Sequence, residues 1–162
     1  MYTDAVAKTL ATLFSELVEG APAGGAYILN AGDDGLLKSL DKLPAAAASA
    51  VTSTGSSIAA HIDHLRYGLS LMNRWSAGEN PFNDADWSAS WRRTTVSEDE
   101  WRALRAELRD EAGRWLKALR VPRDVQEIEL NGMIVSVAHL AYHLGAIRQI
   151  NDRLRGPADT SR

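Results

Sequence analysis

Residues 57–76 read SIAAHIDHLRYGLSLMNRWS, and this stretch decides the fold class. Ser56 or Ser57 can cap the start of a helix here, and Gly78 with Pro81 predicts its end. Spacings of four and three residues alternate between the apolar side chains, as is typical of helices that pack in bundles. These apolar side chains are Ile58, Ile62, Leu65, Leu69 and Met72.

Three other segments carry the same helical pattern. Apolar residues recur every three or four positions over residues 6–17, 101–119 and about 127–154. No segment alternates apolar and polar residues for long enough to predict a strand. Four long amphipathic helices, each with one apolar face, predict an all-α four-helix bundle.

The shorter segments are less regular. A short helix is expected over Asp33–Leu43, where leucines recur and Pro44 stops the helix. Residues 45–57 are rich in Ala, Ser and Thr and are expected to form a connection with at most a helical turn. The helix over 101–119 has a start signal in Ser97–Glu100, a capping box whose acids lie at the positive end of the helix dipole.

The longest connection, residues 76–96, is polar and has no apolar periodicity. At about 3.3 Å per residue it can reach past either helix that it joins. The helices on its two sides can therefore run parallel, with this segment as an overhand crossover. Trp87 and Trp91 in this loop are candidate walls of a substrate pocket, because such pockets are mostly apolar and aromatic. The alternative is that they plug the open end of the bundle.

The chain has 162 residues, which predicts one domain over residues 1–162. Cysteine is absent, and this excludes disulfides, thiolate metal sites and a cysteine nucleophile. The formal net charge of −3 gives no reason to expect nucleic acid or an anionic membrane as a partner. No run of 18 residues is uninterruptedly apolar, and the first twenty residues do not resemble a signal peptide, so a cytoplasmic location is expected.

All four histidines lie in two of the predicted helices, as the pairs His61–His64 and His139–His143. Spacings of three and four residues put each pair on one helix face, beside the apolar stripe. Bundles build metal sites from side chains on facing helices, and neutral imidazole is a common metal ligand. From spacing alone, a metal site and hydrogen-bonded core histidines are open alternatives.

Several known metal patterns do not fit these histidines. His139 and His143 have the spacing of H-E-x-x-H, but Leu140 stands where that motif has its glutamate base. A di-iron carboxylate bundle needs a Glu three residues before each ligating His, and no histidine here has one. A mononuclear, histidine-rich site remains, and it suits zinc, nickel, iron or copper.

Residues 138–149, AHLAYHLGAIRQ, resemble the H-x-x-x-H-x-G-Q-I signature of the DinB/YfiT-like superfamily. Residues 57–65, SIAAHIDHL, are similar to the second-helix motif of that superfamily, and the helix order and long crossover also fit. The resemblance implies an up-down-down-up four-helix bundle that binds one divalent metal through three histidines. In this chain they are His64, His139 and His143. Ala146 departs from the pattern, because the family usually has Gln there.

The resemblance selects His64 as a ligand, although spacing alone would favour His61, which lies nearer the centre of the apolar stripe. His61 is then expected to orient a ligand or a bound water; a fourth ligand and a capped core histidine are the alternatives. Zinc is the first candidate metal, with nickel and iron as alternatives. Relatives are often homodimers, and the resemblance extends this expectation to the present chain.

The resemblance also implies an enzyme that acts on a small molecule. Three protein ligands leave an open coordination position, which is a catalytic arrangement. Relatives include S-transferases that use bacillithiol or mycothiol, and mycothiol-dependent maleylpyruvate isomerase. Because the chain has no cysteine, the thiol would be a cosubstrate that attacks a small electrophile. The alternatives are a metal-dependent hydrolase with Asp63 or Asp152 as base, and a non-catalytic metal-binding bundle.

Overall fold

The computed structural model describes residues 4–53 and 55–158, which form six α-helices and three short 3₁₀ helices. No strand occurs among these residues, so the all-helical prediction is confirmed for them. The chain divides into two compact units, one of residues 1–41 and 119–162 and one of residues 42–118. The expectation of a single domain over 1–162 stays a prediction.

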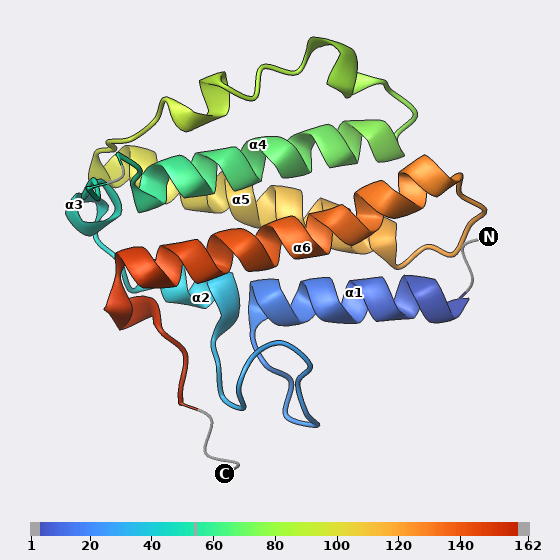
Figure 1. Cartoon of the computed structure of the whole chain (residues 1–162), viewed down its shortest axis with the longest axis horizontal. Helices are drawn as coiled ribbons and strands as arrows, with labels where there is room; N and C mark the ends of the chain where they lie inside the picture. Colours follow the sequence, from blue (N-terminus) through green and yellow to red (C-terminus); the bar gives the residue numbers. More distant parts are fainter. Residues whose placement is uncertain (1–3, 54, 159–162) are drawn as a thin grey trace. The chain divides into compact units, whose positions relative to one another are not determined.

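The first unit contains α1 (Asp4–Glu19), α2 (Gly35–Asp41), α6 (Glu127–Ile150) and the 3₁₀ turn η3 (Asp152–Leu154). α1 packs against both α2 and α6. Figure 1 shows α1 and α6 beginning at the same end of this pair, so the two helices run parallel. The apolar faces of α1, α2 and α6 are buried, as the sequence pattern predicts. The buried side chains include Phe14, Leu17, Leu36, Leu40, Met133, Leu140 and Leu144.

Two glycines let α2 begin close to the end of α1. Gly20 and Gly35 have φ angles of 109° and 66°, and a Cβ atom on Gly35 would lie 2.5 Å from the backbone nitrogen of Gly20. Only glycine fits such an approach without strain. The buried carboxylate of Glu16 holds the loop between them, because it accepts hydrogen bonds from the backbone N–H groups of residues 27–29.

The second unit contains α3 (Ala45–Ala48), α4 (Ile58–Ser76), the 3₁₀ turns η1 (Pro81–Asp84) and η2 (Ala89–Trp91), and α5 (Glu98–Leu119) up to residue 118. Both predicted caps form. Ser57 Oγ accepts a hydrogen bond from the N–H of Ala60 at the start of α4. At the start of α5, Ser97 and Glu100 exchange the two hydrogen bonds of a capping box.

Polar contacts show that α4 and α5 run parallel, because residue numbers on both sides of the contact rise together. Residues 77–97 therefore lead from the end of α4 back toward its start. Figure 1 shows this segment beside α4, which it contacts through η1 and η2. The pairs between α4 and α5 are Arg66–Glu107 and Asn73–Glu111, and Ser57 at the start of α4 bonds to Thr94, four residues before α5.

Two segments, residues 45–57 and the end of α6, are defined more exactly by the structure than by the sequence pattern. The turn allowed within residues 45–57 is α3, a single turn. The last helix ends at Ile150 and not at Leu154, because Asn151 is extended, with φ −138° and ψ 109°. The Asn151 side chain caps η3 instead, and Leu154 is still buried through this 3₁₀ turn.

Among the described helices, α6 is long and apolar enough to cross a membrane by length and composition. The core helix of a soluble protein can pass the same test, and only 39% of the most apolar window of α6 is buried. No uninterrupted apolar run of 18 residues marks this helix in the sequence. α6 is therefore apolar on more than its inward face.

Candidate metal centre

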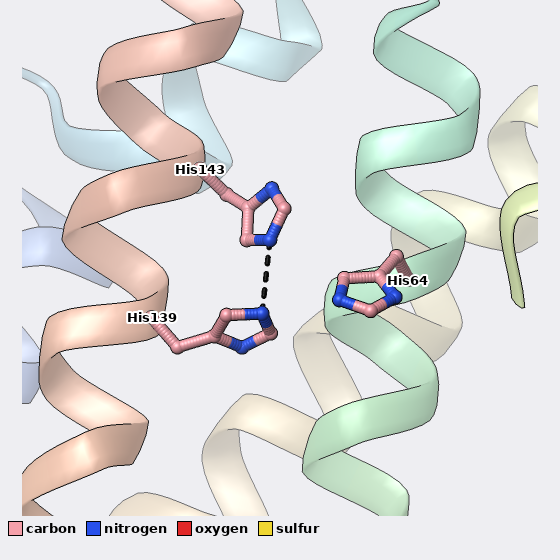
Figure 2. A group of neighbouring side chains, drawn as sticks. All are labelled: His64, His139 and His143. Atoms are coloured by element: carbon pink, nitrogen blue, oxygen red, sulfur yellow. Dashed lines mark hydrogen bonds between the residues drawn. The ribbon is translucent and has the colours of Figure 1, made fainter. Parts of the chain in front are cut away.

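His139 and His143 lie on consecutive turns of α6 and turn toward each other. Their Nε2 atoms are 2.9 Å apart, and the two rings are nearly perpendicular, with centroids 4.4 Å apart. Figure 2 shows this contact as a dashed line. α6 alone thus brings two ring nitrogens to one point, as the four-residue spacing predicts.

Solvent reaches the two histidines of α6 to different degrees. His143 is 2% exposed, whereas His139 is half-buried. Burial lowers the pKa of His139 from its ordinary value, because desolvation disfavours the charged imidazolium. Neutral imidazole is the form that binds metal, so burial keeps His139 in its ligating form at neutral pH.

The spacing of the two Nε2 atoms fits a transition metal. Two nitrogens bound to one tetrahedral zinc at about 2.0–2.1 Å lie about 3.3 Å apart. The observed 2.9 Å is therefore within about half an ångström of the separation that zinc requires. It is also the length of an N–H···N hydrogen bond, which the pair makes when one ring carries a proton on Nε2.

His64 projects from α4 (Figure 2) and is 7% exposed. Its Nδ1 atom lies 2.8 Å from Oγ of Ser90, a residue of η2. Ser90 is itself 4% exposed, and its hydroxyl donates a hydrogen bond of 2.7 Å to the carbonyl oxygen of Trp87. The crossover segment therefore fixes the orientation of the His64 ring.

These two hydrogen bonds also determine which nitrogen of His64 carries the proton. A serine hydroxyl has one hydrogen, and Ser90 donates it to Trp87. Ser90 must then accept a hydrogen bond from Nδ1–H of His64. Nε2 consequently carries the lone pair, which is the tautomer needed to bind a metal through Nε2. The sequence analysis misses Ser90, because no spacing rule connects a loop serine with a histidine 26 residues earlier.

Trp87 and Trp91 of the crossover pack around His64. Trp91 stacks on its imidazole, with centroids 4.4 Å apart and an angle of 25° between the planes. Trp87 lies tilted, with its centroid 5.6 Å away. Both tryptophans keep an exposed edge, with exposed fractions of 41% for Trp87 and 36% for Trp91. Aromatic surface is thus available beside His64, and its role as the wall of a substrate pocket stays a prediction.

His61 lies one turn before His64 on α4. Its ring meets Trp91 edge-on, with centroids 5.1 Å apart and an interplanar angle of 80°. Burial lowers the pKa of His61, so it is neutral at physiological pH. His61 and His64 share Trp91 as a neighbour, whereas the expected role of His61 in orienting a ligand stays a prediction.

Asp63, a candidate base for a hydrolase, is 6% exposed and so is not a solvated surface charge. Its Oδ1 atom lies 2.8 Å from Arg66, and its Oδ2 atom lies 3.7 Å from Arg93. Both contacts are ion pairs, so the two arginines already engage the Asp63 carboxylate. The other candidate base, Asp152, is an exposed residue of η3 in the first unit.

Comparisons with protein-family models, curated proteins and solved structures found no match to this chain. The likeness to the DinB/YfiT-like superfamily therefore rests on the residues of α4 and α6 themselves. Ala146, where that family usually has Gln, is half-buried on α6, one turn after His143. Its methyl group offers no hydrogen bond to a ligand at that position.

Proposed function

We propose that His64, His139 and His143 bind one divalent transition metal, with zinc as the first candidate and nickel or iron as alternatives. The observation that carries the proposal is the 2.9 Å approach of the Nε2 atoms of His139 and His143 on α6. In support, these two histidines and His64 are a group that could hold a metal ion. All three ligands are nitrogens, which suits a transition metal and not calcium or magnesium.

The proposed architecture is the up-down-down-up four-helix bundle that the resemblance implies. Each unit by itself supplies one parallel pair of long helices, α1 with α6 and α4 with α5. A bundle of this topology needs these two parallel pairs.

The proposed reaction is the transfer of a low-molecular-weight thiol to a small electrophile. A metal held by His64, His139 and His143 would supply an open coordination position for an incoming thiol and would favour its thiolate form. The chain itself orients His64 through Ser90 and offers the exposed edges of Trp87 and Trp91 to an apolar substrate. The thiol has to come from a cosubstrate, because the chain has no cysteine. The ion pairs of Asp63 favour this reaction over hydrolysis with that residue as base.

Metal analysis of the purified protein is the first test. We expect one equivalent of transition metal per chain in the wild type and in Gln149→Ala, a matched control at an exposed position of α6. His139→Ala should lose the metal while its circular dichroism stays helical. Full metal content in His139→Ala would contradict the proposed ligand set.

Thiol conjugation to a generic electrophile, with and without a chelator, is the second test. A rate that depends on both thiol and metal supports the transferase. Metal-dependent loss of the electrophile without thiol would indicate a hydrolase. A metal-loaded protein that accelerates neither reaction would be the non-catalytic metal-binding bundle.

A further inference from the structure

One flank of α6, on the solvent side of its histidine pair, carries side chains that the proposed function does not use. Val135 is 59% exposed, Tyr142 is 71% exposed and Ala146 is half-buried. At 3.6 residues per turn, all three project within about 60° of His139 around the helix axis. The buried leucines of α6 lie on the other side of the histidine pair. A ligand that approaches His139 from solvent along α6 therefore meets this flank.

The flank carries no charge of its own, because the sequence between Leu130 and Ile147 has no Asp, Glu, Lys or Arg. A charged ligand would lose water against the flank without gaining an opposite charge from it, which is unfavourable. A neutral ligand with an apolar body avoids this loss and buries apolar surface. The flank therefore favours a neutral, apolar ligand.

Tyr142 places an aromatic ring and one hydroxyl group beside the histidine pair. Its ring meets the imidazole of His143 edge-on, with centroids 5.1 Å apart and an interplanar angle of 87°. His143 is 2% exposed, so Tyr142 rests on a buried side chain while most of its own surface stays open to solvent. Aromatic rings pack well against one another, and a tyrosine adds a hydrogen-bond donor at the end of an apolar body. Tyr142 thus suits a ligand that has a ring and a hydrogen-bond acceptor.

Ala146 lies four residues after Tyr142, so the two side chains are neighbours on the helix surface. Its methyl group is too short to cover the tyrosine ring. The Gln that the DinB/YfiT-like superfamily usually has at this position is long enough to reach that ring and would add a polar amide. The alanine therefore leaves room for a flat ring to lie against Tyr142.

We infer that Tyr142 contacts the electrophile, and that this substrate is a neutral aromatic ring that bears a nitro or carbonyl group. The inference rests on the proposed thiol transfer and names its substrate class. The ring of the electrophile lies against Tyr142 beside Ala146, and the Tyr142 hydroxyl donates a hydrogen bond to the nitro or carbonyl oxygen. Tyr142 is then a residue that determines specificity and not a metal ligand.

The reaction of 1-chloro-2,4-dinitrobenzene, called the nitro probe below, shows how this hydrogen bond acts. The thiol releases its proton to solvent, and the thiolate sulfur forms a bond to the ring carbon that carries chlorine. An electron pair of the ring moves onto the nitro oxygens, where a hydrogen bond from Tyr142 stabilises the developing negative charge. Chloride then leaves with the electrons of its bond, so the products are a thioether, chloride and one proton.

Rates with two electrophiles test the specificity. Conjugation of cysteine to the nitro probe is compared with its conjugation to iodoethane, which has no ring and no acceptor group. Tyr142→Phe should lower the ratio of the two kcat/KM values by about 3- to 10-fold, the contribution of one hydrogen bond. Tyr142→Ala should lower this ratio by a further factor of about 3 to 10, because the aromatic contact is also lost. An unchanged ratio in both variants would overturn the inference.

Tyr27 offers a matched control for these variants, because it is 79% exposed and lies in the loop between α1 and α2. Tyr27→Phe and Tyr27→Ala should leave the ratio unchanged. Metal content is measured for every variant, and Tyr142→Phe should bind as much metal as the wild type. A loss of metal in Tyr142→Phe would show that the residue acts on the metal site and would overturn its role in specificity.

Binding of 1,3-dinitrobenzene, which has no leaving group, gives a readout that needs neither metal nor thiol. Saturation-transfer NMR should detect this probe on the wild type and on Tyr27→Ala, and the signal should fall in Tyr142→Ala and in Ala146→Gln. Circular dichroism checks that each variant is still helical. Equal signals from the wild type and Tyr142→Ala would overturn the inference. If the protein conjugates no electrophile but binds the probe through Tyr142, the proposed function fails and the contact at Tyr142 stands.

Discussion

α6 and α4 hold their histidines in different ways. On α6, His139 and His143 contact each other because they are one turn apart, and the helix alone creates the contact. On α4, the orientation of His64 depends on Ser90 and Trp91, which a long crossover brings to it. The α6 histidines are thus positioned by secondary structure and His64 by tertiary contacts. Substitutions in the crossover should therefore affect the orientation of His64 and not the contact between His139 and His143.

The largest expected effect separates the two histidines of α4. His64→Ala should reduce bound metal to background, because it removes a ligand. His61→Ala should cost roughly 10- to 100-fold in metal affinity, as is typical for a residue that orients a ligand without touching the metal. Competition with a calibrated chelator measures both affinities. Equal losses in the two variants would mean that the α4 ligand is wrongly assigned.

Ser90 tests whether the crossover sets the tautomer of His64. Ser90→Ala should weaken metal binding by roughly 10- to 100-fold, and Ser90→Thr should restore it because the hydroxyl returns. Ser88→Ala is the control, since Ser88 lies in the same segment and bonds to Asp86. In the metal-free protein, ¹⁵N NMR should show His64 protonated on Nδ1 in the wild type. A proton on Nε2 would rule out the proposed role of Ser90.

The pH dependence of metal binding tests the burial of the α6 pair. Protonated imidazole cannot bind a metal, so metal should be released as the pH falls below about 6. Burial lowers the pKa of His139, so its protonation requires a lower pH than that of a solvent-exposed histidine. Bound metal measured across a pH series checks that metal is released as the pH falls and not as it rises. Half-release above pH 7 would contradict it.

The smallest effect is expected for Trp91, which stacks on His64 of α4. Trp91 is 36% exposed, so Trp91→Ala should leave metal content intact and reduce stability by less than the about 3–5 kcal/mol typical of a deleted buried aromatic. It should alter turnover or ligand binding if Trp91 forms the wall of a pocket. Thermal melts of the metal-loaded variant measure the stability. A loss within that full range would show that Trp91 is a core residue.

Local sequence signals predict the features of the molecule that local physics determines. Ser57 and Ser97 cap their helices as expected, because a cap depends on neighbouring residues alone. The contact between His139 and His143 follows from helical spacing in the same way. The end of α6 cannot be predicted in this way, because the apolar Leu154 continues the helical pattern although the helix already ends before Asn151.

Local sequence signals do not predict contacts between segments that lie far apart in the sequence. Ser90 reaches His64 only because the crossover returns along α4, and no residue spacing encodes that path. One of the two ion pairs of Asp63 is likewise made by a distant residue, Arg93, near the end of the same segment. The exposed apolar side chains of α6, such as Val135 and Tyr142, cannot be told from its buried ones by sequence for another reason. Apolar residues on both faces of a helix blur its periodicity, and only the burial of each residue separates the two faces.

The metal content of the triple variant His64→Ala, His139→Ala, His143→Ala is the most direct test of the central claim. Wild type and triple variant would be purified side by side, and elemental analysis would be paired with circular dichroism. The account predicts one equivalent of transition metal in the wild type and none in a triple variant that is still helical. Stoichiometric metal in the folded triple variant would contradict it.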